Sequence, residues 1–366
     1  MVLQLTLPVI AAIGSGAALV GAVSVYGMRK IILMGQFSYH NARLSTVGNP
    51  YVTREEVFPL LDIKDASTLL KSIQGDLSLP DGVSSFREAD RALMVAFHRT
   101  IDDMGKDAPG ILSPLVRSFM VLWEVEELKR LLRLVGKRTD PLYPIGILGE
   151  DIERQFLQAQ NISQAIELLE GQKVNRAIAP LMKDADVDLE EIDSVMDRFV
   201  LDQFRDVEGL AFTSRRGARA IADLLADRYN IQLIIRSKII GWGRDDTLSH
   251  LYSRGGTVGT THLEQMVDSS SLRESLSVLN GTYLEKFFKE AVDRGPAAVE
   301  AALEKMLLDG SVGLSHSYGS NVGPTIRYLV SKEMELKNIR TLVQASFAGW
   351  DPERTRSQLI LEGGVQ

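Results

Sequence analysis

The chain has 366 residues, of which 45% are hydrophobic and 24% are charged, a composition typical of a globular protein of two or three domains or of a repeat array. Its 48 acidic residues outnumber its 41 basic ones, and the net charge of −7 disfavours the positive surface that carries most nucleic-acid affinity. Cysteine is absent, which excludes disulfides, thiolate metal sites and a cysteine nucleophile.

The first predicted element is an apolar N-terminal helix. Residues 3–28 contain no charged side chain, and a helix crosses a bilayer core with about 20 apolar residues. A signal peptide would carry its positive charges before this stretch, whereas Arg29 and Lys30 follow it, and a buried helix so free of charge is unusual in a soluble protein. We therefore predict a membrane helix and junction in residues 1–35, with lipid contact through residues 3–28 and the rest of the chain on the cytoplasmic face of the cell membrane.

The chain then shows an internal repeat. Three segments, 65–75, 161–171 and 271–281, align without gaps, and each begins with a helix-capping residue type and ends with glycine. Apolar or small residues recur in each at i, i+3, i+4 and i+7, which predicts a helix with one buried face.

A second marker repeats in the same order. Segments 228–242 and 334–350 share an Asn-Ile pair and a final Gly-Trp pair, and 123–136 is a weaker copy that lacks both. Asn230 and Asn338 fall in mid-helix, where asparagine is a poor helix former, so we expect each to bind neighbouring backbone or side-chain groups.

The two markers together predict three similar helical units of roughly 100 to 110 residues, because they recur at about the same interval. The predicted units are 36–140, 141–245 and 246–366. Long helical patterns at 86–102 and 188–204 lie between the markers, and strand signals are nearly absent. The predicted fold class is therefore all-α, with one transmembrane helix in front.

No pattern in the sequence predicts catalysis. The glycine-rich stretch 255–261 has neither the lysine nor the preceding strand of a phosphate-binding loop, so we interpret it as a flexible turn. The five histidines are scattered, and the acidic clusters at 124–127 and 190–193 are interpreted as solvated helix faces. We expect a protein that is not an enzyme, without cofactor, metal or small-molecule substrate. A membrane-bound hydrolase would need a nucleophile and base that we do not find.

One set of charged residues suggests an interaction surface. Glu333, Lys337 and Arg340 recur at i, i+4 and i+7 and so share a face of the last repeated helix. The sequence leaves two interpretations open: a solvated stripe, or a surface that docks another protein.

Two stretches resemble a known family. Tyr39-His-Asn-Ala-Arg43, followed by an acidic helix start at 53–62, resembles the Y-x-N-A-R entry to the first unit of the C subunit of archaeal A-type and bacterial V-type ATP synthases, whose eukaryotic counterpart is the d subunit of the vacuolar proton pump. Residues 323–343 resemble the family's closing segment, in which proline precedes a long charged helix. The apolar N-terminus is not part of the family's shared core. We expect Tyr39, Asn41 and Arg43 to form a packed entry segment, with a partner interface as the alternative.

The resemblance implies a funnel of three similar units in a pseudo-three-fold arrangement. It also implies a non-catalytic rotor component of the central stalk, placed on a ring of proteolipid subunits that carry protons or sodium ions. The funnel would receive the central shaft of D- and F-type subunits and transmit torque between ion translocation and ATP synthesis or hydrolysis. The alternative from another class is a membrane-anchored helical scaffold or binding module unrelated to a rotary ATPase.

Overall fold

The computed structural model describes residues 34–135, 158–181, 188–207 and 212–363, with isolated residues between 24 and 32, residues 155–156 and residue 210. The predicted membrane segment, residues 3–28, lies almost wholly outside these residues. Within the described part, no helix combines the length and the apolar character needed to cross a membrane.

All regular structure in the described residues is helical and none is a strand, which confirms the all-α prediction. The first part contains the short 3-10 helices η1 (Pro50–Val52), η2 (Gly75–Leu77) and η3 (Gly110–Leu112), and the helices α2 (Arg54–Leu61), α3 (Ala66–Ser72), α4 (Phe86–Asp107) and α5 (Ser113–Leu132). The middle contains α7 (Ile162–Glu167), α8 (Lys173–Ile178), α9 (Leu189–Arg205), α10 (Phe212–Ile240), α11 (Arg244–His250) and α12 (Thr260–Asp268). The last part contains α13 (Leu272–Ser277), α14 (Glu285–Phe288), α15 (Ala291–Arg294), α16 (Pro296–Ser317), α17 (Gly323–Ala348) and α18 (Pro352–Gln358).

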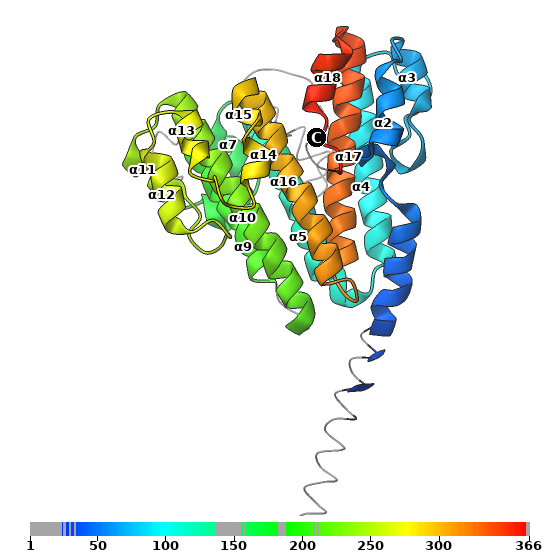
Figure 1. Cartoon of the computed structure of the whole chain (residues 1–366), viewed down its shortest axis with the longest axis horizontal. Coiled ribbons are helices and arrows are strands. Elements are labelled where there is room, and N and C mark those ends of the chain that lie inside the picture. Colours follow the sequence, from blue (N-terminus) through cyan, green and yellow to red (C-terminus); the bar gives the residue numbers. More distant parts are fainter. Residues whose placement is uncertain are drawn as a thin grey trace, which may run out of the picture.

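The long helices run side by side and splay apart towards one end of the molecule (Figure 1). In this view α2–α4, α17 and α18 stand on the right, α7 and α9–α15 stand on the left, and α16 runs between the two groups. Helix α16 packs on both α17 and α10, so it joins the two sides. The helical residues 34–47 lie at the end where the long helices converge (Figure 1).

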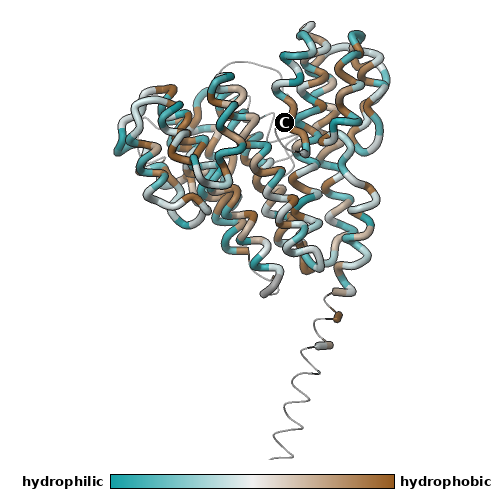
Figure 2. The backbone as a smooth tube through the Cα atoms, viewed as in Figure 1, coloured by the Kyte–Doolittle hydropathy of each residue, from teal (hydrophilic) through white to brown (hydrophobic). Residues whose placement is uncertain are grey.

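Hydrophobic burial holds this arrangement together. One large core extends through α2–α10 and on to α17 and α18, and a smaller core lies between the second half of α10 and α12–α16. Hydrophobic and hydrophilic residues alternate along the helices (Figure 2), so most helices offer one apolar face to a neighbour. Helix α17 is buried on nearly every side, because α16, α4, α3, α18 and η1 all pack against it.

The first sequence marker corresponds to a repeated local structure. The N-cap side chains of α3, α7 and α13, which are Asp65, Asn161 and Ser271, each accept a hydrogen bond from the backbone N–H three residues later. The same positions are buried in all three copies. The predicted helices are too long, because each ends three or four residues before its glycine. Those glycines, Gly75, Gly171 and Gly281, have φ values of 80°, 87° and 79°, the left-handed region that only glycine adopts without strain.

The second marker corresponds to two equivalent asparagine contacts. Asn230 of α10 donates to the carbonyl of Tyr252 at 3.0 Å and accepts from the Tyr252 N–H at 2.8 Å. Asn338 of α17 does the same with Ile360, at 2.7 Å in both directions, and also donates to the carbonyl of Tyr51. In both cases the bound backbone lies 22 residues further along the chain. The expectation that these asparagines meet neighbouring backbone is therefore confirmed.

We predict that Asn338→Ala destabilises the protein by about 3 kcal/mol, because it leaves buried backbone groups of Tyr51 and Ile360 without hydrogen-bond partners. Asn230→Ala removes fewer bonds and should cost about 2 kcal/mol. Urea unfolding measures both. The exposed amide of Gln344, on the same helix as Asn338, gives the matched control, and equal costs for Asn338→Ala and Gln344→Ala would contradict the prediction.

Candidate functional site

Buried and half-buried charged residues gather where the long helices meet. Helix α5 contributes Lys129, α9 contributes Asp197, α10 contributes Arg228, α16 contributes Glu304 and α17 contributes Glu333. Charges are rarely buried unless they are paired. Each of these residues has a partner of opposite charge, and most of the partners come from another helix. We call these residues, together with Trp123, Glu126 and Lys337, the central charge network.

The contacts of the central charge network form two sets. Lys129 binds Asp197 of α9 and lies 3.1 Å from Glu126 of its own helix. Arg228 binds Glu304 at 2.6 Å, and Glu304 lies 3.0 Å from Lys337.

The second set also reaches helix α5. Lys337 also binds Glu333 at 2.6 Å, and the Nε1–H of Trp123 donates to the other Glu333 oxygen at 3.0 Å. Because Trp123 belongs to α5, which also carries Lys129, this hydrogen bond joins α5 directly to α17.

Burial and neighbouring charges shift the pKa values of the network's side chains in different directions. Burial alone would raise the pKa of Glu333, but Lys337 and Arg228 outweigh it and hold this pKa below its usual value. For Asp197, burial exceeds the effect of Lys129 and raises the pKa to about 6. Burial also lowers the pKa of Lys129, but Asp197 and Glu126 more than compensate, so this pKa is raised. The Lys129 ammonium therefore stays charged at neutral pH.

The structure brings the three residues predicted on α17 into this interior region. Glu333 is only 6% exposed, so the interpretation of the three residues as a solvated stripe is wrong for it. Lys337 and Arg340 are partly exposed, and Arg340 binds Asp90 of α4 at 2.6 Å. They share a face, as predicted, but that face looks towards α4, α5 and α16. Their contact with a partner protein stays a prediction.

The three residues predicted near the N-terminus lie elsewhere, on the helix of residues 34–47. Asn41 donates to the carbonyls of Gly319 and Asn321 at 3.2 Å, and Arg43 pairs with Asp107 at the end of α4. These contacts attach the helix to the α16–α17 connection and to α4, as expected of a packed entry segment. Tyr39 is 75% exposed, so it remains available to a partner.

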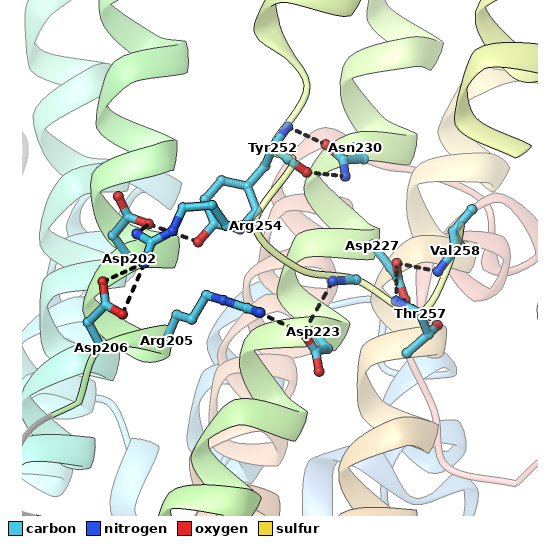
Figure 3. A network of polar contacts seen from close by, with 11 residues as sticks. Asp202, Arg205, Asp206, Asp223, Asp227, Asn230, Tyr252, Arg254, Thr257 and Val258 are labelled. Carbon is cyan, nitrogen blue, oxygen red and sulfur yellow. Dashed lines mark hydrogen bonds and ion pairs between the residues drawn. The ribbon is translucent and has the colours of Figure 1, made fainter. Parts of the chain in front are cut away.

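The glycine-rich stretch is a loop that acidic residues hold in place (Figure 3). Asp227, which has no exposed surface, accepts from the N–H groups of Thr257 and Val258 at 2.8 and 3.0 Å. Asp223 accepts from the Gly256 N–H at 3.2 Å and also binds Arg205 at 3.1 Å. A carboxylate thus occupies the backbone amides that a phosphate would need. The stretch is a turn, as interpreted, but it is not flexible, since carboxylates of α10 hold its backbone by hydrogen bonds.

Other acidic positions also differ from the sequence interpretation. Glu124, Glu127 and Asp193 are buried, whereas their clusters were interpreted as solvated faces. The sequence missed Arg228, Glu304, Lys129 and Asp197 for the same reason: on a single helix, a buried charge with a remote partner looks like an exposed charge. Among the described residues, no group of three or more histidine, aspartate or glutamate side chains is arranged to hold a metal ion. The central charge network can fix the register of five helices.

Comparisons with known proteins cover nearly the whole chain. Residues 55–358, from α2 to α18, match the profile of a family described as ATP synthase (C/AC39) subunit. The chain is similar to the C subunit of the A-type ATP synthase of Pyrococcus abyssi, at 22% identity over 88% of this chain and 90% of that protein. It is also similar to the proteins of the same name from Methanocaldococcus jannaschii, at 21% identity over 92% and 90%, and from Methanothermobacter thermautotrophicus, at 21% over 94% and 93%.

Asp197→Asn should change how stability depends on pH. The pKa of Asp197 is about 6 in the folded protein but about 3.9 in an unfolded chain. The folded state therefore binds this proton more tightly, and the resulting stability is complete below about pH 4 and is lost as the pH rises through about 6. Urea unfolding of the wild type and of Asp197→Asn should show the wild type losing stability relative to the variant over this range. The exposed Asp245→Asn controls for net charge, and a pH-independent difference would contradict the prediction.

Gly256→Ala should destabilise the protein by about 2 kcal/mol or more, since alanine is strained at positive φ. Gly256 has φ of 108°, and a Cβ atom there would lie 2.7 Å from Asp227 Oδ1. Gly313→Ala is the matched control, because a Cβ on this helical glycine meets no atom within 4 Å, and alanine should stabilise α16 by up to about 1 kcal/mol. Thermal unfolding compares the two, and a tolerated Gly256→Ala would show that the loop is not pinned.

Proposed function

This chain belongs to the ATP synthase (C/AC39) subunit family, and from that membership we propose that it is the non-catalytic central-stalk component of an A-type ATP synthase. In this role it seats the central shaft of D- and F-type subunits on the membrane proteolipid ring. It thereby transmits torque between ion translocation and ATP synthesis or hydrolysis. The observation that carries the proposal is the match over residues 55–358, together with relatives named as the C subunit of A-type ATP synthases that align over about nine tenths of both chains.

The proposal includes three units, 36–140, 141–245 and 246–366, arranged as a pseudo-three-fold funnel. The equivalent structures of α3, α7 and α13, with their matching caps and left-handed glycines, support the repeat. The asparagine contacts of α10 and α17 support it for the last two units.

A part that transmits torque must resist deformation. Close-packed helices have low compressibility, and paired charges across helices oppose sliding because each helix would have to break buried ion pairs. The central charge network supplies such pairs between α5, α9, α10, α16 and α17. These contacts support a rigid socket.

The end of the molecule that carries the helix of residues 34–47 is proposed to face the membrane. Large apolar side chains are exposed along it, at Met28, Ile31, Ile32, Met34 and Tyr39. The uncharged residues 3–28 precede this helix in the sequence, and we propose that they contact the ring or the surrounding lipid. The remaining chain would then lie on the cytoplasmic face of the cell membrane.

An alternative function is a membrane-anchored scaffold or binding module, which would share the helical repeats but not the rotor partners.

A pull-down tests the assignment. The tagged full-length chain, extracted from its native membranes in mild detergent, should recover the shaft subunits together with the ring proteolipid, as identified by mass spectrometry. Recovery of neither, with the tagged chain intact and well expressed, would overturn the rotor proposal and favour the scaffold.

Deletion of residues 1–28 should lower retention of the chain on ring-containing membranes after a salt wash, because it removes the proposed membrane contact. Tyr39→Ala should weaken retention by a smaller amount, and Tyr283→Ala, which removes an exposed tyrosine at a distant site, should leave it unchanged. Quantitative immunoblotting of washed membranes gives the retained fraction. Full retention of the deletion variant would show that this end of the chain does not hold it on the membrane.

A further inference from the structure

A cavity of about 370 Å³ lies between α5, α8 and α9, away from the central charge network. Its volume falls in the range of small-molecule sites, which are mostly apolar with a few convergent polar groups. The apolar lining comes from three helices: Met120, Val121, Val125, Leu128, Val174 and Phe199. Charged and polar groups line the rest.

One carboxyl oxygen in this lining has no hydrogen-bond partner among the described residues. Glu124 of α5 is only 5% exposed, and its Oε2 atom forms no hydrogen bond with any of them. By contrast, Glu333 and Asp227 each bind several donors. An unsatisfied buried carboxyl is costly, so its retention in a cavity wall points to a ligand.

The protonation of Glu124 indicates which group it would bind. Burial raises its pKa to about 8, against the opposing effect of Arg117. Below that pH the carboxyl is mostly neutral and carries a proton that it can donate. Such a donor suits an oxygen acceptor, and above all a carboxylate.

Two cations at the same cavity favour an anionic acceptor. Arg117 of α5 and Lys173 of α8 both line it, both are exposed, and neither forms an ion pair with a described residue. Helix α9 contributes Gln203 and no charged group to the lining. Asp102 of α4 acts on Glu124 from outside the lining. The lining therefore combines apolar walls, a protonated acid and two cations that pair with no acid in the described part of the chain.

We propose that this cavity binds a small amphiphile with an apolar body and a terminal carboxylate, which accepts the Glu124 proton and lies between Arg117 and Lys173. The apolar body would pack against Met120, Val174 and Phe199. Such a ligand would join α5 to α8 and α9. The inference does not rest on the rotor assignment, since it uses only the cavity and its side chains.

Isothermal titration of the full-length chain with decanoate, kept below its micellar concentration at pH 7, tests the proposal. We expect saturable binding at one site. Glu124→Leu should weaken it at least about tenfold, because a hydrogen bond to a charged group is lost. Glu124→Gln keeps a donor of similar shape and should bind within about threefold of the wild type. Arg117→Gln should weaken the binding of decanoate but not the binding of 1-decanol, because 1-decanol carries no charge.

Two further variants locate the site and guard against misfolding. Val174→Phe should block binding by filling the cavity while Glu124 is unchanged. Lys305→Met alters a second, cation-lined cavity beside α16 and α18 and should leave the affinity unchanged. Decanoate should also raise the melting temperature of the wild type but not that of Glu124→Leu. Absence of saturable binding, or wild-type affinity in both Glu124→Leu and Val174→Phe, would overturn the proposal, as would loss of binding in Lys305→Met alone.

Discussion

Buried charge is the constraint on which the arrangement of the long helices depends. A carboxylate or ammonium group taken out of water is stable in the folded state only when an opposite charge or several hydrogen-bonding groups meet it at close range. In this protein most of the partners lie on other helices: Lys129 meets Asp197, Arg228 meets Glu304, and Glu333 meets Trp123 in addition to Lys337 of its own helix. Rotating any one of these helices would leave charges of its neighbours unpaired. The apolar cores supply most of the driving force for association, and the charges select one register.

The same use of polar groups to fix geometry occurs at the loops. Asn230 and Asn338 each hold the backbone of a segment 22 residues away, and Asp227 binds the amides of the loop that follows α11. We expect these segments to be rigid, because each of these buried side chains binds backbone that lies outside its own helix. Glu124 departs from this rule, and for that reason it is the group that we assign to a ligand and not to the fold.

Much of the local structure was predictable because it depends on neighbours in sequence. The caps at Asp65, Asn161 and Ser271, the helical stretches predicted at 86–102 and 188–204 and the repeated glycines follow from residue types at short spacings. The lengths of the repeated short helices were not predictable in this way, since each helix ends three or four residues before its glycine. The solvated interpretation of Glu124, Glu127 and Asp193 was wrong because helical periodicity reports which residues share a face and not what that face meets.

The sequence by itself determined the all-helical class, the repeated capping and glycine pattern and the family, because these depend on patterns carried by the chain itself: periodicity, capping residues and the order of residues in the closing segment. The tertiary structure alone decided which charges are buried and with what they pair. Glu333 and Trp123 lie 210 positions apart, and Arg340 and Asp90 lie 250 apart. No local pattern relates such residues, since only the packing of whole helices brings them within hydrogen-bond distance.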